Sequence, residues 1–386
     1  MKNNEFDLII IGGGALGTFH AYHALNKGLN VALLEKDKTP ISATVRNFGM
    51  VVPSGMDSKW QNYGRKSLDI YKELQDKVDL TLRESGSIYI ASNEEEVVLL
   101  EELAQINRQN GYASKLLTKQ ECLFRYPGLR ADYVQAGLFF PEEVLVEPRV
   151  MVQQLQNYLT REKGLSLLPY QQVNHCSVQN GKAEVLTSFG QKLMSEQVII
   201  CNGSEFKTLF PEVFVKSDLE VVKLQMMQTK PQPSSFTLPS GVLSGMSIRR
   251  YEAFSECPSF QSIKEKEDTG SLSKKWGINL LFKQAIDGSV IIGDSHEYAS
   301  VRDADDLGFD VNEDINKLLL SEAKKMFALP TFGIENRWIG LYSQSKKHDI
   351  FEHSIDGQIH ILTGIGGKGM TGSGGYAQEK IAQLYK

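Results

Sequence analysis

The chain of 386 residues lacks the signatures of several protein classes. It has four cysteines, none in a CxxC pair, which argues against a disulfide framework and a zinc knuckle. Its seven histidines include no HExxH pair, so we expect no metal site. The 42 basic and 47 acidic residues are interspersed without a basic stripe, and nucleic acid is therefore not an expected partner.

Long apolar segments are also missing. Runs such as Leu8 to Ile11 are far shorter than a membrane span, and no basic segment leads into a long apolar stretch near the N-terminus. We therefore expect a soluble, cytoplasmic protein with no membrane span.

The N-terminal segment has the pattern of a β-α-β unit. Phe6 to Ile11 predicts a buried parallel strand, and apolar residues recur at helical spacing from Ala15 to Lys27. Gly28 supplies a helix stop, and Val31 to Leu34 predicts a second strand that delivers Glu35.

The glycines between the first strand and the helix have the spacing of a dinucleotide-binding turn, Gly12-x-Gly14-x-x-Gly17. Glycine is needed first for the tight turn, second for approach of the pyrophosphate and third for close helix packing. Free amides at the helix start then hold the anion, and Glu35 accepts hydrogen bonds from a ribose hydroxyl. The motif predicts a bound dinucleotide but does not distinguish NAD from FAD.

The rest of the chain mixes helices and strands. The patterns predict helices at 94–110, 147–162 and 370–385, a hairpin over 173–186 that turns at Asn180-Gly181, and strands at 196–201, 223–229, 278–293 and 359–362. The strands from 223 to 293 are expected to form a separate antiparallel sheet. The lysine-rich segment 255–275 is expected to be a mobile surface excursion, with an active-site lid as the alternative.

Three segments, taken with the first motif, resemble the D-amino acid oxidase, glycine oxidase and sarcosine oxidase superfamily. They are the strand and turn Glu196 to Ser204, the strand start at Val173, and the glycine turn Gly364 to Thr371 before the last helix. The resemblance implies FAD, a mixed α/β fold of the GR2 type, and hydride transfer from an amine to flavin N5. In the family, Val173 falls where the backbone holds adenine, and the last helix start faces the flavin pyrimidine edge.

The resemblance also implies a discontinuous domain organisation. Residues 1–85, 145–220 and 335–386 correspond to a Rossmann-like FAD-binding domain. Residues 86–144 and 221–334 correspond to a substrate domain built on an antiparallel sheet.

Shorter strings point to one branch of this superfamily. Arg46-Asn47-Phe48-Gly49-Met50, Gly293 to Tyr298 and Arg337 to Tyr342 resemble a bacterial branch that accompanies phosphonate-degradation genes. That likeness implies a 2-aminoethylphosphonate, with or without an N-methyl group, as the substrate.

Two departures from better-known relatives shape this expectation. Glycine oxidases place an arginine where this chain has Tyr342, and that arginine pairs the substrate carboxylate. The cysteine that holds flavin in sarcosine oxidases corresponds to Gly340, so FAD is expected to be non-covalent.

The motif and the resemblance together predict the site residues. The residues expected to contact FAD are Gly12, Gly14, Ala15, Leu16, Gly17, Glu35, Lys36, Arg46, Asn47, Phe48, Gly49, Val173, Asn202, Gly203, Gly340, Gly366, Gly367, Lys368, Gly369, Met370 and Thr371. Those expected to act in catalysis are His296, Lys368 and Arg46. Those expected to bind substrate are Tyr342, Arg46, His296 and Arg249.

Each catalytic or substrate residue has an ordinary structural alternative. The alternatives are a surface arginine for Arg46, a satisfied structural histidine for His296, a solvent-facing lysine for Lys368, and a tyrosine that only packs for Tyr342. Arg249 and Arg250 are taken to follow a strand, on which neighbours point to opposite faces, so at most one binds substrate.

Four functions stay open at this point. The first is an aminophosphonate-type amine oxidase that uses oxygen and yields peroxide, and the second is a glycine or D-amino acid oxidase. The third is an amine dehydrogenase with another electron acceptor. The last is a dinucleotide-binding regulator without catalysis.

Overall fold

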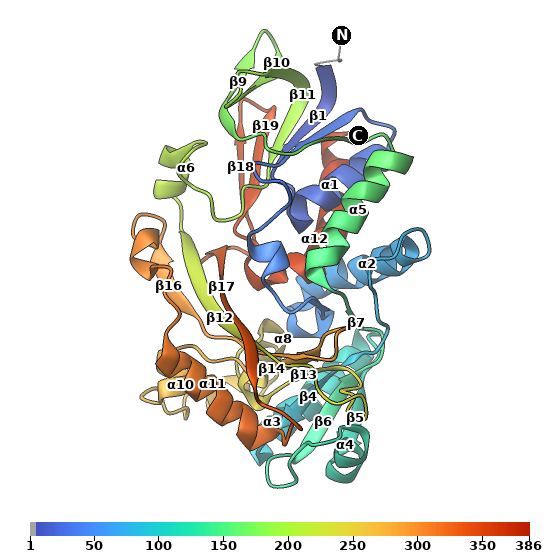
Figure 1. Ribbon diagram of the computed structural model, residues 1–386, viewed down its shortest axis with the longest axis vertical. Helices are drawn as coiled ribbons and strands as arrows, with labels where there is room; N and C mark the ends of the chain where they lie inside the picture. The colour runs from blue at the N-terminus through green and yellow to red at the C-terminus, as the bar shows by residue number, and fades with distance from the viewer. Residues whose placement is uncertain (1–4) are drawn as a thin grey trace.

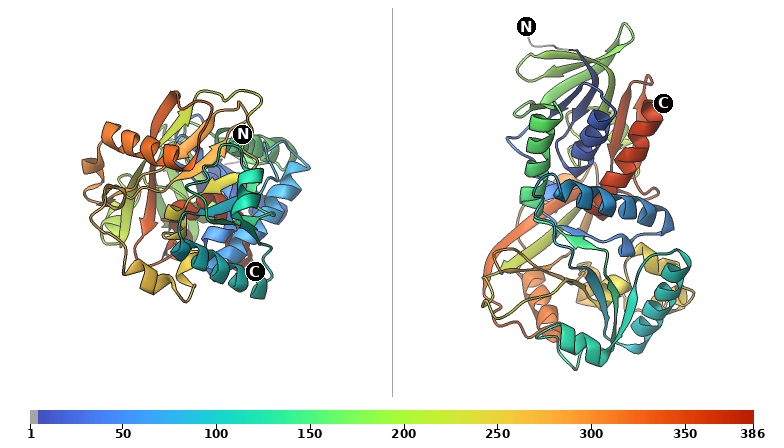
Figure 2. Two further views of the ribbon diagram at one scale, coloured as in Figure 1. Left: turned by 90° about the horizontal axis from the view of Figure 1, so that it is seen from below. Right: turned by 90° about the vertical axis from the view of Figure 1, so that its right-hand side faces the viewer.

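Two β-sheets, one toward each end of an elongated molecule, organise the chain in the computed structural model, which describes residues 5–386 (Figure 1, Figure 2). The sheets draw on alternating parts of the sequence. The chain therefore passes between them several times, and segments far apart in the sequence meet where the sheets adjoin.

The first sheet has eight strands in the described residues, with a parallel centre in which β1 lies between β11 and β2. Its core strand β1 is buried over Leu8 to Ile11, as expected for a parallel strand covered on both faces. Its strands are β18 (Phe351–Ile355), β19 (Ile359–Thr363), β11 (Lys192–Ile200), β1 (Glu5–Ile11), β2 (Val31–Leu34) and β8 (Ser166–Leu168), with the hairpin β9 (Val173–Gln179) and β10 (Lys182–Thr187) continuing from β11.

The second sheet has nine strands in the described part of the chain and is mostly antiparallel. In order it contains β16 (Glu297–Ser300), β12 (Leu219–Thr229), β15 (Val290–Gly293), β14 (Leu281–Gln284), β13 (Gly241–Leu243), β4 (Ser87–Ala91), β6 (Ala136–Phe140) and β5 (Lys115–Thr118), with β17 (Ile334–Ser345) paired to β12. A short pair, β3 (Met50–Val51) and β7 (Val144–Leu145), lies apart from both sheets.

Helices cover both sheets. In Figure 1, α1, α5 and α12 lie beside the first sheet, while α3, α4 and α11 lie around the second. The α-helices are α1 (Ala15–Asn26), α2 (Ser58–Gln75), α3 (Glu94–Gln109), α4 (Lys119–Arg125), α5 (Pro148–Glu162), α6 (Pro211–Val215), α7 (Gly245–Ile248), α8 (Glu252–Ser255), α9 (Phe260–Lys264), α10 (Leu272–Lys275), α11 (Glu313–Met326) and α12 (Gly369–Leu384). The 3-10 helices are η1 (Ala43–Val45), η2 (Pro53–Gly55), η3 (Ala304–Leu307) and η4 (Gly366–Lys368).

The local patterns predict several of these elements correctly. The β-α-β unit forms as expected from β1, α1 and β2, and Asn180 and Gly181 turn the β9–β10 hairpin with positive φ of 51° and 78°. The separate antiparallel sheet of the central region is also confirmed.

The segment 255–275 is not the loose surface excursion that its lysines suggest. It folds into α9 and α10, and its apolar residues Cys257 and Ile263 are buried with Phe254 in the core that includes α3. Ser259 fixes it further, because its Oγ donates to Glu102 of α3 at 2.6 Å. The apolar spacing of three residues, rather than the charge, indicates this packing.

The strand β17 departs from the division expected from the sequence. Residues 335–386 are expected in the FAD-binding part, but β17 pairs along its length with β12 of the second sheet. Long-range strand pairing decides this placement, and no local pattern reports it.

The helices of the described residues do not meet the requirements of a membrane span. None of them combines the length and the apolar character needed to cross a bilayer.

Candidate functional site

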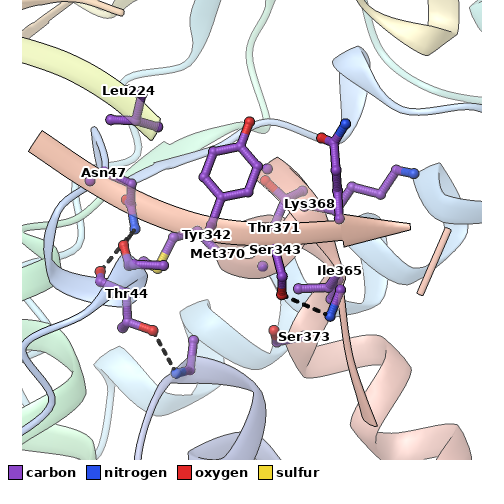
Figure 3. A pocket seen from close by; sticks show the side chains of 18 of the residues that line it. Thr44, Asn47, Leu224, Tyr342, Ser343, Ile365, Lys368, Met370, Thr371 and Ser373 are labelled. Atoms are coloured by element: carbon purple, nitrogen blue, oxygen red, sulfur yellow. Dashed lines mark hydrogen bonds between the residues drawn. The ribbon is translucent and has the colours of Figure 1, made fainter. Parts of the chain in front are cut away.

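A cavity of about 690 Å³ lies where the two sheets adjoin. Its lining combines the start of α1, the loop around η1, strand β17, and the turn that leads into α12. In Figure 3, Tyr342 rises from β17 between Asn47 on one side and Lys368 on the other. The volume is in the range of cofactor sites, which reach about 1,000 Å³.

The glycine turn at one end of the cavity needs its glycines for close packing. Gly12 has a φ of +105°, and a Cβ there would lie 2.2 Å from the carbonyl oxygen of Cys201. A Cβ at Gly17 would lie 2.0 Å from the oxygen of Gly12. These two glycines let α1 pack tightly behind β1, and Gly14, the N-cap of α1, makes no side-chain cap and lines the cavity with Ala15.

Glu35 supports this turn from behind. The Gly13 amide donates to one carboxylate oxygen at 2.9 Å, and the Asp37 amide donates to the other at 3.0 Å. Within residues 5–386, the cavity lining includes neither Glu35 nor Lys36. Glu35 is buried. The two amides use only some of the carboxylate lone pairs, and the others are the acceptors available to a ribose hydroxyl.

The loop after β2 forms one wall, and its polar groups hold its own backbone. Asn47 donates to the carbonyl oxygens of Ala43 and Thr44 at 3.0 and 2.8 Å, and its oxygen accepts from the Gly49 amide at 2.7 Å. Phe48 also lines the cavity.

Arg46 ties this wall to β17. Its guanidinium donates to the carbonyl oxygens of Ile41 at 2.6 Å and Ile339 at 3.0 Å, and the Trp338 indole donates back to the Arg46 carbonyl oxygen. Arg46 lines the cavity, but these contacts use its donors to fix the loop. Its expected catalytic role remains a prediction.

The second glycine turn, at the end of β11, lies beside β17. The carbonyl oxygen of Gly203 accepts hydrogen bonds from Ser343 at 2.8 Å and Thr363 at 2.7 Å, and Gly203 and Gly340 both line the cavity. The neighbouring Asn202 keeps a buried side-chain oxygen that has no hydrogen-bond partner among the described residues.

Besides Glu35 and Lys36, four of the residues expected to contact FAD are absent from the lining that the described residues form. They are Gly12, Gly17, Val173 and Asn202. Gly12 and Gly17 pack against backbone, and Val173 is buried at the start of β9.

The turn before α12 brings the residues 366–371 to the cavity as expected. Gly366, Gly367, Gly369 and Met370 all line it. Thr371 lines it too, and its hydroxyl accepts from the Val52 amide at 3.0 Å, which joins α12 to the β3 region.

Lys368 is paired with acidic groups. Its ammonium lies 2.8 Å from Glu252 and 3.0 Å from Asp349, and it sits over the Trp60 ring. Burial opposes its charge, but these two carboxylates prevail and raise the pKa of Lys368. Carboxylate oxygens of Asp57, Glu252 and Asp349 all lie within 4.8 Å of one another. The ammonium of Lys368 offsets part of the negative charge of these three carboxylates.

The end of the cavity toward the second sheet has a different set of polar groups. Arg250 donates to the Tyr298 hydroxyl at 2.8 Å, and both line the cavity together with Asp294 and His296. Tyr342 of β17 also lines the cavity, and its ring meets that of His296 edge-on with the ring centroids 6.5 Å apart.

His296 is neutral here. Its Nδ1 lies 2.9 Å from the Gly277 carbonyl oxygen, which can only accept, so Nδ1 carries the proton. Burial and then the charge of Arg250 lower the pKa of His296 to about 3. The residue therefore offers Nε2 as an acceptor and does not supply a cation.

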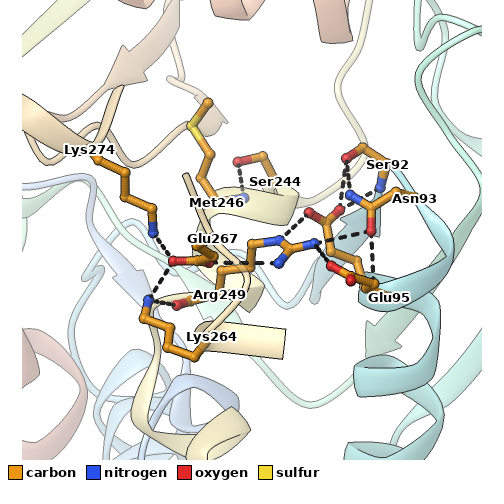
Figure 4. A network of polar contacts seen from close by, with 10 residues as sticks. Ser92, Asn93, Glu95, Ser244, Met246, Arg249, Lys264, Glu267 and Lys274 are labelled. Atoms are coloured by element: carbon orange, nitrogen blue, oxygen red, sulfur yellow. Dashed lines mark hydrogen bonds and ion pairs between the residues drawn. The ribbon is translucent and has the colours of Figure 1, made fainter. Parts of the chain in front are cut away.

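Arg249 lies in a network of polar contacts (Figure 4) and is absent from the cavity lining that residues 5–386 form. It pairs at 2.9 Å with both Glu95 and Glu96 of α3 and at 3.7 Å with Glu267. The two arginines follow the short helix α7 rather than a strand, and Arg250, not Arg249, reaches the cavity. The acidic start of α3 thus reverses the choice between neighbours that the sequence suggested.

Asp294 and Tyr298 are cavity residues that the sequence did not single out. Both lie in the string Gly293 to Tyr298, in which only His296 was expected at the site. Tyr251 and Asn279 carry no local signal, and they reach the cavity through the folding of the second sheet.

Comparisons with known proteins agree with this architecture. The model of the family DAO, FAD dependent oxidoreductase, matches residues 7–384. One of the opine oxidase polypeptides of Rhizobium meliloti is 24% identical over 368 residues, covering 89% of this chain and 86% of that protein.

Solved structures show the same fold. Glycine oxidase from Geobacillus kaustophilus superposes with a TM-score of 0.77 at 18% identity, covering 99% of this chain and 95% of that one. The L-proline dehydrogenase from P. horikoshii gives a TM-score of 0.81 at 18% identity, covering 99% and 94%.

Proposed function

This chain belongs to the DAO family of FAD-dependent oxidoreductases, and we propose that it oxidises a small amine that also carries an anionic group. The observation that carries the proposal is Arg250, a guanidinium at the substrate end of a cavity otherwise lined there by tyrosines, His296 and Asp294. We take a 2-aminoethylphosphonate, with or without an N-methyl group, as the substrate. Glycine and D-amino acids are the second candidates.

The residues at the other end of the cavity fit FAD. Gly14, the N-cap of α1, has no capping side chain, and the Thr44 hydroxyl accepts from the Ala15 amide at 2.9 Å; the glycine turn before the helix offers backbone amides suited to a pyrophosphate. At the other turn Gly367 leaves room, since a Cβ there would meet nothing within 4 Å. When bound, the flavin supplies the acceptor for the hydride of the amine α-carbon.

The chain's own residues bind and orient the substrate. Arg250 receives the anionic group with a charge-assisted hydrogen bond, and Tyr298 already holds the guanidinium in place. His296 is neutral and accepts a hydrogen bond at Nε2 rather than contributing positive charge. Tyr342 shapes the wall on the β17 side.

The geometry at Tyr342 supports the choice of a phosphonate as the anionic group. An arginine at that position would pair a carboxylate bidentately, but here the charge comes from the second sheet, at Arg250. That displacement supports a longer substrate, such as an aminoethylphosphonate, over glycine. We further propose that oxygen reoxidises the cofactor and that hydrogen peroxide and an imine, which water hydrolyses, are the products.

An amine panel tests the proposal. Anaerobic holoenzyme is mixed with 2-aminoethylphosphonate, its N-methyl derivative, glycine, sarcosine and D-alanine, and the bleaching of the flavin is followed. We expect the aminophosphonates to give the highest rate constant over Kd, and peroxide to form in air. Preference for the carboxylates would favour the amino acid alternative, and bleaching with slow reoxidation in air would favour a dehydrogenase. No bleaching by any amine would refute amine oxidation.

A further inference from the structure

Asp294 carries a carboxyl group at the substrate end of the cavity that forms no ion pair with a lysine or arginine of residues 5–386. It follows β15, and its backbone is fixed by two hydrogen bonds with Asn279, at 2.8 and 2.5 Å. Its side chain is 13% exposed and lines the cavity. Among the described residues, its buried Oδ1 has no hydrogen-bond partner.

The surrounding groups do not satisfy this oxygen. The nearest nitrogen of His296 is 3.8 Å away and already donates to the Gly277 carbonyl oxygen. The ion pairs of residues 5–386 do not include one between Arg250 and Asp294, although both line the same cavity. The cation and the carboxylate are thus held apart across the space.

A buried carboxylate oxygen without a donor is unfavourable, so such groups are rare and need an explanation. Asp294 lies in a cavity, beside a cation that it does not pair with, and this arrangement is complementary to a dipolar ligand. An anion would face Arg250, and an N–H donor would face Asp294.

We propose that Arg250 and Asp294 form a two-ended site for a zwitterionic amine, in which Asp294 binds the substrate ammonium and accepts its proton. The assignment rests on the proposed oxidation of an amine. In this step an N–H bond breaks, the proton passes to a carboxylate oxygen of Asp294, and the nitrogen keeps its electron pair. Nothing is oxidised, and the amine reaches the neutral form that hydride transfer requires.

The electrostatics of the cavity suit a proton acceptor. Burial raises the pKa of Asp294 to about 7, while the charge of Arg250 works against that rise. The other titratable groups that face it are Tyr251, Tyr298, Tyr342 and His296; burial raises the pKa of Tyr251 to about 12 and pushes that of Tyr342 upward. A pKa near the working pH is favourable for general base catalysis.

The test measures separately the binding of the anionic end of the substrate, assigned to Arg250, and of its amino end, assigned to Asp294. Holoenzyme carrying Asp294→Asn, Arg250→Met or the exposed control Asp310→Asn is titrated with ethylphosphonate, which lacks the amine, and the flavin absorbance change gives Kd. We expect Arg250→Met to raise the Kd of ethylphosphonate at least about tenfold. We expect Asp294→Asn to bind it as tightly as the wild type, or more tightly, because a like charge is removed.

Reduction by the amine provides the second readout. At pH 7, Asp294→Asn should reduce its flavin with 2-aminoethylphosphonate at least about 100-fold more slowly than the wild type, the usual size of a general base effect. The rate should recover toward high pH, where the free amine arrives without its proton. The proposal is overturned if Asp294→Asn keeps the wild-type rate and pH profile. It is also overturned if the affinity of this variant for ethylphosphonate falls as much as its affinity for the amine.

A wild-type measurement keeps the proposal testable if Asp294→Asn fails to fold. The rate of flavin reduction divided by Kd should depend on an ionisation near pH 7 in the free enzyme, and the absence of any ionisation between about pH 5.5 and 8.5 would overturn the role of Asp294. Failure of the proposed function is distinct, because the wild-type flavin would then not be reduced by any amine.

Discussion

Arg249 and Arg250 are adjacent in the sequence, and we expect the same substitution to lower thermal stability at Arg249 and substrate affinity at Arg250. Arg249→Met removes a cation from a buried acidic network, and Arg250→Met removes one from the cavity. Methionine keeps an apolar side chain of similar length. Arg302→Met, at an exposed position, is the matched control.

The expected loss of stability for Arg249→Met follows from burial. Its partner Glu96 has a side chain only 5% exposed, and Arg249 itself is 17% exposed. Glu267 keeps Lys264 and Lys274 as partners, so the unpaired charge is that of Glu96. Leaving a buried charge unpaired costs about 3–5 kcal/mol. An unfolding entropy of about 0.8 kcal/mol/K, from roughly 2.1 cal/mol/K per residue over 386 residues, converts this to a fall in Tm of roughly 4–6 °C.

The expected loss for Arg250→Met concerns the substrate instead. A hydrogen bond to a charged group contributes about 1.5–3 kcal/mol, which corresponds to roughly tenfold to 150-fold in Kd. Its hydrogen bond within the protein is with Tyr298, so the Tm should change little.

Thermal melting of purified holoenzyme and the concentration dependence of flavin reduction measure the two effects on the same samples. Flavin content is determined first, so that loss of cofactor is not mistaken for loss of substrate affinity. If Arg249→Met raised the substrate Kd as much as Arg250→Met does at equal flavin content, the assignment of Arg250 to the cavity would be refuted. A large fall in Tm for Arg250→Met alone would also refute it.

Three substitutions and one extraction test other parts of the structure. Gly17→Ala should lose most of its FAD, because the new Cβ would lie 2.0 Å from the Gly12 oxygen, and full flavin content in an absorbance spectrum would contradict that packing. Burial raises the pKa of Glu143 to about 7, above its unfolded value of about 4.3, so the protonated form stabilises the fold at low pH and that contribution is lost as the pH rises through 7. Glu143→Gln keeps the neutral form, so wild-type stability should fall relative to the variant by up to about 3 kcal/mol between pH 4 and 8 in denaturant titrations, with Glu142→Gln showing no such trend. Lys368→Met should shift the two-electron flavin potential by less than about 30 mV, because two carboxylates already balance the ammonium, and a larger fall would indicate direct stabilisation of reduced flavin. Acid denaturation should release all of the FAD into the supernatant, and retention on the protein would contradict non-covalent binding.

The parts of the fold that the sequence predicts are those with local causes. The turn at Gly12 to Gly17 is visible because a strand, a tight turn and a helix follow one another within a few residues. The hairpin turn at Asn180-Gly181 is visible for the same reason. By contrast, β17 joins the second sheet through pairing with β12, more than 100 residues earlier, and no pattern within β17 encodes that partner.

The choice of Arg249 over Arg250 fails for a related reason. Both are arginines and they are adjacent in the sequence, so the contact of one of them with α3, whose first turn carries Glu95 and Glu96, is what distinguishes them. A helix start that concentrates acidic charge is readable from sequence, but its contact with a segment about 150 residues later is not.

The string from Gly293 to Tyr298 shows how burial changes the chemistry that residue types suggest. His296 stands out in the sequence because the side chain of a free histidine has a pKa of about 6.5. The side chain of a free aspartate has a pKa of about 3.9. Removing water disfavours the charged form of both, which lowers the pKa of His296 to about 3 and raises that of Asp294 to about 7. As a result, at neutral pH the histidine is a fixed neutral acceptor, and the aspartate, which the sequence did not single out, is the group that can gain or lose a proton. The position of a titratable group relative to solvent, which only the folded chain sets, therefore decides which member of this string can perform acid–base chemistry.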